Sequence, residues 1–142
     1  MPRHKKTHGI VQILIDYRPA LRNRTGVGVW VCKLIEALAE AHADALGITA
    51  FSSSWKDRFT ATLPASIRQV DRRVPVRILN WLWHRREWPP IEFLAGGPFD
   101  VVHSPSPLLI PTNGAASLVT IHDVDFLTHP ERAHGEIQRD YP

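Results

Sequence analysis

The sequence predicts an α/β fold, in the form of a Rossmann-like, doubly wound domain built on a mostly parallel sheet. Short runs of β-branched residues alternate along the chain with segments of helical periodicity, which is the pattern of parallel strands joined by helices. Polar residues and glycines follow several predicted strands, as they do where such sheets bind ligands. The composition, 44% hydrophobic and 22% charged over 142 residues, is typical of one globular domain with an ordinary core.

The first third of the chain predicts a strand, a loop and a helix. Residues 1–9 are basic and polar, and we expect them to be flexible. Residues 10–15 are rich in β-branched side chains and end at Asp16, so they predict a buried strand. Residues 17–28 contain a proline and two glycines and predict a loop. Residues 29–42 have helical periodicity, with one apolar face made of Val31, Leu34, Ile35, Leu38 and Ala39.

The middle of the chain predicts two further strands and a second helix. Residues 47–51 predict a strand, and residues 52–66 predict a loop or short helix. A third strand is expected within residues 67–74, broken by the charged residues 71–73. The helical periodicity of residues 76–88 is stopped by two prolines.

The last third predicts two more strands. Residues 99–102 form a short predicted strand, followed by a proline-rich loop at 105–114. Residues 117–121 predict a buried strand that ends at His122-Asp123. The sequence has no internal repeat and no interdomain linker, and its final residues begin an element without a partner. We therefore expect a single domain over residues 10–142 that is truncated.

The bulk properties exclude several classes of protein. A net charge of +3 is too small to argue for nucleic acid binding. Cys32 is the only cysteine, so no intrachain disulfide can form. No apolar run approaches the ~18 residues needed to cross a bilayer, and the N-terminus lacks the apolar core of a signal peptide. These observations predict a cytoplasmic protein, with peripheral contact at the inner face of the membrane as an option.

Polar segments follow three of the predicted strands. Asp16-Tyr17-Arg18 and Thr25-Gly26-Val27-Gly28 follow the first strand, His103-Ser104 follows the short strand, and His122-Asp123 follows the last. Ligands bind beyond the carboxyl ends of strands in open parallel sheets. We therefore expect these segments to converge on one edge of the sheet.

Gly26 and Gly28 precede a helix, where backbone N–H groups can approach a phosphate at the positive helix end. The spacing matches neither of two phosphate-binding motifs. A dinucleotide-binding turn would have glycine at Val31, and a P-loop needs Gly-Lys-Ser/Thr. The alternative is a turn that serves only close strand–helix packing.

His122 and Asp123 form a polar pair at a strand end, which can bind a sugar hydroxyl, share a proton or hold a metal. The alternative is a histidine that only bonds to a loop carbonyl. A second reading, a small metal-dependent hydrolase, rests on a wider cluster, although no spacing in it matches a known zinc pattern. That cluster contains His122, Asp123, Asp125, His129, Glu131 and His134.

Residues 76–88 interleave tryptophans with basic side chains, namely Trp81, Trp83 and Trp88 with Arg77, His84, Arg85 and Arg86. Such a helix can lie on an anionic membrane, which makes a non-catalytic module that docks on a membrane or a partner a third reading. The alternative is a helix packed on the sheet with solvated arginines.

Taken in order, the strand-end segments resemble glycosyltransferase family 4, closest to mannosyltransferase-like members of bacterial polysaccharide assembly. That subgroup opens with Asp-x-Arg, then Thr-Gly-[Ile/Val]-Gly and an amphipathic helix, as in Asp16 to Gly28. Its later pattern resembles Asp100-Val101-Val102-His103-Ser104, Thr120-Ile121-His122-Asp123 and His129-Pro130-Glu131. The resemblance runs from about residue 10 to about residue 132, and residues 52–98 carry no part of it.

The resemblance implies the N-terminal half of a GT-B fold and retaining transfer of a hexose from a GDP- or UDP-sugar to a glycan or lipid-linked acceptor. It implies no cofactor and no required metal. By motif, Gly26 and Gly28 would approach the donor diphosphate, and His122 and Asp123 would act at the transferred sugar. The acceptor side would be formed by Arg18, Thr25, His103 and Ser104. The second domain of that family, with its paired glutamates, has no counterpart in these residues, so we expect little or no transferase activity from this chain alone.

Overall fold

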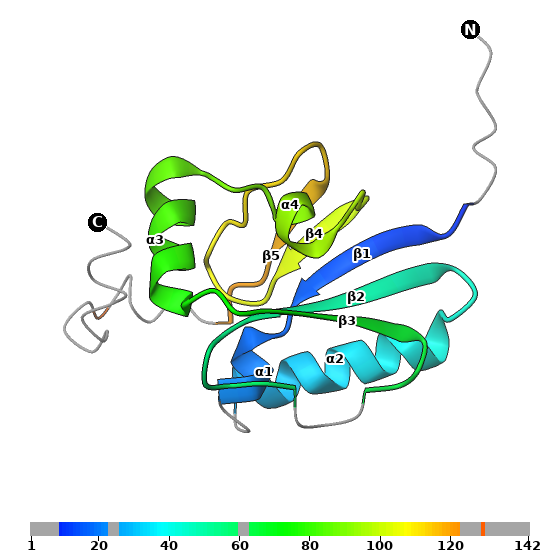
Figure 1. Cartoon of the computed structure of the whole chain (residues 1–142). Coiled ribbons are helices and arrows are strands. Elements are labelled where there is room, and N and C mark those ends of the chain that lie inside the picture. Colours follow the sequence, from blue (N-terminus) through cyan, green and yellow to red (C-terminus); the bar gives the residue numbers. More distant parts are fainter. Residues whose placement is uncertain (1–8, 23–25, 60–62, 123–128, 130–142) are drawn as a thin grey trace, which may run out of the picture.

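The computed structural model describes residues 9–22, 26–59, 63–122 and 129. It contains a five-stranded, all-parallel sheet with helices on both faces (Figure 1), which confirms the predicted α/β fold. The predicted flexible N-terminus, apart from Gly9, lies outside the described residues and stays a prediction.

The strands follow the order β3-β2-β1-β4-β5, which places β1 at the centre of the sheet. The chain builds β1, β2 and β3 towards one edge and then returns to the other side of β1 for β4 and β5. The topological switch point therefore lies between β1 and β4, where doubly wound sheets open a crevice for ligands. The strands span Val11–Asp16 (β1), Leu46–Ser53 (β2), Ile67–Arg72 (β3), Val101–Ser104 (β4) and Ala116–Val119 (β5).

Successive residues of the strands supply two hydrophobic cores, one on each face of the sheet. In β1, Leu14 packs into one core and Ile15 into the other, and both are fully buried. In β2, Phe51 joins Leu14, whereas Ala50 joins Ile15. This alternation follows from the two-residue period of a strand that is covered on both faces.

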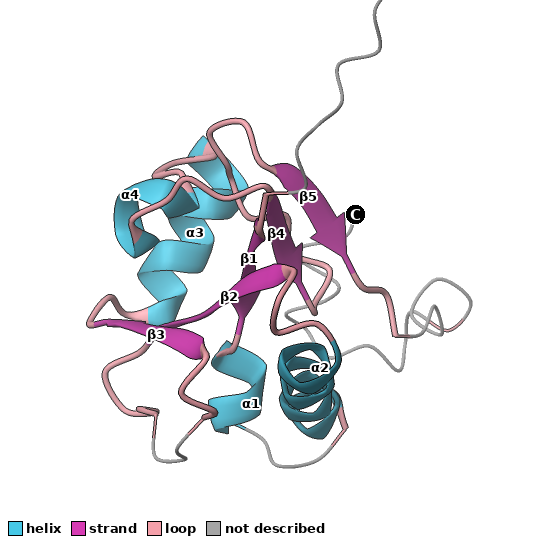
Figure 2. Ribbon diagram, turned by 90° about the vertical axis from the view of Figure 1, so that its right-hand side faces the viewer, coloured by secondary structure: helices cyan, strands magenta, loops and turns pink. Residues whose placement is uncertain are grey.

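Helices α1 (Arg18–Arg22) and α2 (Val27–Ala41) cover the face of the sheet opposite to α3 and α4 (Figure 2). Helix α2 buries Val31, Ile35 and Ala39, as its predicted apolar face requires. The prediction of a loop over residues 17–28 is wrong for α1 and for the first turn of α2. Pro19 is compatible with a first helical turn, and the buried residues Tyr17 and Ala20 anchor the short helix.

Helix α3 (Val76–Arg86) packs on the other face through Leu79 and Trp83. The sequence did not predict the short helix α4 (Ile91–Ala95), which begins after Pro90. Gly96 caps its C-terminus in the left-handed conformation, with a φ of 71°. No helix among the described residues is long and apolar enough to cross a membrane.

Two predictions about the edge strands are wrong. Strand β3 is not broken at residues 71–73 but runs through Asp71 to Arg72, because an edge strand can turn charged side chains outward; Arg58 pairs with Asp71 at 2.9 Å. The predicted buried strand at 117–121 is β5, which ends at Val119 and is largely exposed. In the described part of the chain β5 pairs only with β4, so its outer side has no partner strand.

Candidate functional site

The carboxyl ends of β1 and β4 lie side by side at the switch point of the sheet. Ile15 of β1 is in register with His103 of β4, and His103 is in register with Leu118 of β5. The predicted segments after these three strands therefore begin at one rim, as the sequence led us to expect. We call the carboxyl ends of β1, β4 and β5, with the start of α2, the switch-point rim.

The glycine turn contributes the start of α2 to this rim. Gly26 is the exposed N-cap of α2, with a φ of 58° that L-amino acids rarely adopt, and Gly28, two residues further, is buried. Among the described residues no side chain caps the helix, and its first turn has no acidic residue. Within that part of the chain the first N–H groups of α2 have no side-chain acceptor, as an anion site at a helix N-terminus requires. Thr25 lies outside the described residues.

Two histidines stand at the rim with different surroundings. His103 is 6% exposed, and its Nε2 lies 2.8 Å from Thr120 Oγ1. His122 is exposed, and its Nε2 donates to the Pro105 carbonyl oxygen at 3.0 Å. This hydrogen bond to a loop carbonyl is the one expected under the alternative interpretation of His122 in the sequence analysis. Because a carbonyl only accepts, Nε2 of His122 carries a proton, and Nδ1 is the acceptor of the neutral ring.

Trp30 connects the glycine turn to both histidines, and sequence reasoning missed it. Its ring packs edge-to-face on His122, with ring centroids 4.9 Å apart, and on His103, at 6.0 Å. Trp30 is 36% exposed on the first turn of α2, and its backbone N–H bonds to the Gly26 carbonyl. A tryptophan directly after a glycine turn was the signal that the sequence offered, since the two histidines lie far along the chain.

Burial lowers the pKa of His103, and repulsion from the nearby His122 imidazole, when that ring is protonated, lowers it further. Both causes disfavour the charged ring, so His103 is neutral near pH 7. A neutral His103 can exchange a hydrogen bond with Thr120 in either direction, and it adds no charge to the rim.

Asp16 and Arg18 form an ion pair that is almost removed from solvent. The Arg18 guanidinium contacts both carboxylate oxygens of Asp16, at 2.8 and 2.7 Å, with 10% and 2% of the two side chains exposed. Arg18 also donates to Asn80 Oδ1 at 2.8 Å and stands 5.0 Å from the Trp83 ring centroid. Arg18 therefore ties the end of β1 to α3, and most of its donors are already used within the protein.

Serines occupy the carboxyl ends of β4, at the switch-point rim, and of β2, next to β1. Ser104, a predicted acceptor contact, is 2% exposed, and its hydroxyl donates to the Ser106 carbonyl at 2.9 Å, which holds the turn after β4. At the end of β2, Ser52 and Ser53 are fully buried, and their hydroxyls have no hydrogen-bond partner within the described ranges. The sequence did not single out Ser52 and Ser53.

No group of three or more histidine, cysteine or carboxylate side chains that could hold a metal occurs among the described residues. Most of the cluster behind the hydrolase reading lies outside them, as does the predicted catalytic partner of His122. The residues concerned are Asp123, Asp125, Glu131 and His134.

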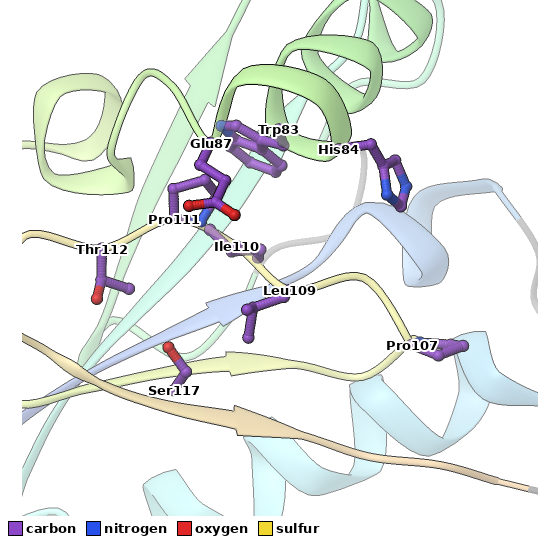
Figure 3. Close-up of a pocket in the computed structure, with 9 residues that line it drawn as sticks. All are labelled: Trp83, His84, Glu87, Pro107, Leu109, Ile110, Pro111, Thr112 and Ser117. Atoms are coloured by element: carbon purple, nitrogen blue, oxygen red, sulfur yellow. The ribbon is translucent and has the colours of Figure 1, made fainter. Parts of the chain in front are cut away.

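A pocket of about 410 Å³ opens between the C-terminal end of α3 and the loop that joins β4 to β5 (Figure 3). Its lining combines an apolar floor with polar side chains, and Trp83 links it to the Asp16–Arg18 pair. The lining residues are Trp83, His84, Glu87, Pro107, Leu109, Ile110, Pro111, Thr112 and Ser117. None of them was predicted from the sequence as a site residue.

In comparisons with known proteins, no protein-family model, no curated protein and no solved structure matches this chain significantly.

Proposed function

We propose that this chain is the acceptor-side domain of a retaining glycosyltransferase, which moves a hexose from a nucleotide sugar to a glycan or lipid-linked acceptor. The observation that carries the proposal is the meeting of the glycine turn and His122 at the switch-point rim, where Trp30 bonds to Gly26 and its ring centroid lies 4.9 Å from that of His122. The motif resemblance supplies the reaction class.

The start of α2 is suited to the donor phosphates. Within the described ranges its N–H groups have no side-chain cap, and no carboxylate lies in the first turn of the helix to repel an anion. A helix N-terminus stabilises negative charge by its dipole and its free donors. In the proposed reaction, these groups stabilise the diphosphate as it departs.

His122 is suited to the transferred sugar. Its imidazole is exposed, it is oriented by the Pro105 carbonyl, and Trp30 packs against it. In its neutral form, a ring that donates Nε2–H to this carbonyl has Nδ1 as an acceptor for a sugar hydroxyl. The buried His103 packs against the same tryptophan and hydrogen-bonds to Thr120, which helps to fix the position of the Trp30 ring.

The pocket beside α3 is the proposed acceptor site. Its floor is apolar, and Glu87, Thr112 and Ser117 supply oxygen atoms that can accept or donate hydrogen bonds. Sugars present both apolar ring faces and hydroxyls, and such mixed surfaces suit pockets of this kind. Arg18 acts indirectly here, since it packs on the Trp83 ring that lines the pocket.

Titration of the 142-residue chain with UDP- and GDP-hexoses, followed by amide and imidazole NMR shifts, tests the proposal. We expect shifts at residues 26–30 and at the His122 ring. The dissociation constant should be about millimolar, because a nucleotide sugar would contact only a few groups of this chain. Replacing His122 by alanine removes one hydrogen bond to the sugar and should weaken binding about fivefold.

His42→Ala is the matched control, because His42 is exposed at the opposite end of α2 and should leave binding unchanged. Shifts confined to residues away from the rim, or equal effects of the two histidine substitutions, would contradict the proposal.

A further inference from the structure

The outward face of α3 is apolar and basic at the same time. Leu79 and Trp83 turn inward, whereas Ile78 and Trp81 are 54% and 56% exposed. Arg77 and Arg85 lie one helical turn to either side of Trp81, on the same face, and both are exposed. The described residues thus place a tryptophan between two arginines, with no acidic side chain within α3.

Positive charge is concentrated on this part of the chain. Residues 72–86 contain five arginines and no carboxylate, whereas the whole chain carries only +3, so the rest of it sums to −2. Neither Arg77 nor Arg85 forms an ion pair with another described residue. Three of these arginines, Arg77, Arg85 and Arg86, lie on α3, and Arg72 and Arg73 precede it. Basic residues on an amphipathic helix attract anionic lipid head groups.

We propose that the outward face of α3 binds the surface of an anionic phospholipid membrane, with Trp81 and Ile78 at the level of the head groups and Arg77 and Arg85 on lipid phosphates. Exposed tryptophan is the side chain that membrane interfaces favour, and guanidinium groups complement phosphates. The positive charge of this face is complementary to an anionic lipid surface, which is why we propose a membrane as its partner.

This docking would bring the switch-point rim close to the lipid. The inner side of α3 carries Asn80, which bonds to Arg18 at the end of β1. A helix with its side chains is about 10–12 Å thick, so the rim would stand roughly one helix diameter from the head groups. The inference does not depend on the proposed transferase function, because binding to a membrane requires no reaction.

Sedimentation of the chain with vesicles tests the inference, comparing mixed phosphatidylglycerol–phosphatidylcholine vesicles with phosphatidylcholine alone. We expect binding to the anionic vesicles only, and its loss at high salt, where surface charges are screened. At low salt, Arg85→Gln should weaken binding about fivefold, and Trp81→Ala should also weaken it, because the apolar contact with the head-group region is lost.

The matched controls are Arg22→Gln, on α1 at the opposite face of the sheet, and Trp55→Ala, 66% exposed on the loop after β2. Both should bind as the unchanged chain does, and circular dichroism should show all variants folded. Absence of binding to anionic vesicles, or equal losses in the controls, overturns the inference. So does concentration-dependent self-association that Trp81→Ala abolishes, because the face would then bind a second copy of the chain.

Discussion

Replacing Arg18 by methionine should destabilise the protein strongly. Methionine keeps an unbranched apolar stem against Trp83 but removes the guanidinium. The substitution leaves the Asp16 carboxylate, on a residue that is 1% exposed, without its cation, and it leaves the Asn80 side chain without its donor.

The magnitude follows from burial. Removing one partner of a buried ion pair costs about 3–5 kcal/mol, whereas exposed pairs contribute about 0–1 kcal/mol. The Arg18 side chain is 10% exposed, so some water reaches it, and we expect the lower end, about 3 kcal/mol. For a chain of this length, such a loss lowers the melting temperature by about 10 °C.

Urea unfolding followed by circular dichroism measures this loss. Arg22→Met, at the exposed end of α1, should change the free energy of unfolding by less than about 0.5 kcal/mol. Adding Asp16→Asn to Arg18→Met should recover part of the loss, because the stranded charge is gone. A loss below about 1 kcal/mol for Arg18→Met would show that the pair behaves as a surface pair, and the connection of β1 to α3 would need another explanation.

Three further perturbations have defined outcomes. The pKa of His103 is lowered in the folded protein, so the unfolded chain binds the proton first as pH falls through about 6.5. The free energy of unfolding should therefore fall by at most about 1.4 kcal/mol per pH unit. His103→Gln should remove this dependence of stability on pH. Gly26→Ala should lower the free energy of unfolding, measured by chemical denaturation, by about 1–2 kcal/mol. The cause is the φ of 58°, which is strained for alanine, since an added Cβ would meet no atom within 4 Å. Gly9→Ala is the control, because a Cβ at Gly9 is equally uncrowded and no positive φ opposes it. Elemental analysis of the purified chain should find no stoichiometric metal, and one ion per chain that is lost in His122→Ala would favour the hydrolase reading instead.

The sequence predicted those parts of the fold that depend on local patterns. Each of these patterns is encoded by neighbouring residues: the β-branched run at β1, the apolar face of α2 and the stop after α3. Short elements were harder to predict, because the five residues of α1 and of α4 carry little more than one helical turn of periodicity. The exposure of β5 depends on its position at the edge of the sheet, which its own residues do not determine.

The candidate site divides in the same way. The placement of Gly26, His103 and His122 at one rim follows from parallel strands, whose carboxyl ends share an edge. The contacts that give these residues their properties are long-range. Trp30 reaches both histidines, and Asn80 binds Arg18, only after the helices have packed on the sheet. Periodicity and spacing contain no information about such contacts.

The proposed site depends most on the packing of Trp30 between the glycine turn and the two histidines, and two-dimensional NOE spectroscopy tests this packing directly. Ring centroids 4.9 and 6.0 Å apart predict cross-peaks from the Trp30 indole protons to the imidazole protons of both His122 and His103. If the indole shows no cross-peak to either imidazole in the folded chain, the glycine turn and the histidines do not share one rim, and the proposed sugar-transfer site is contradicted.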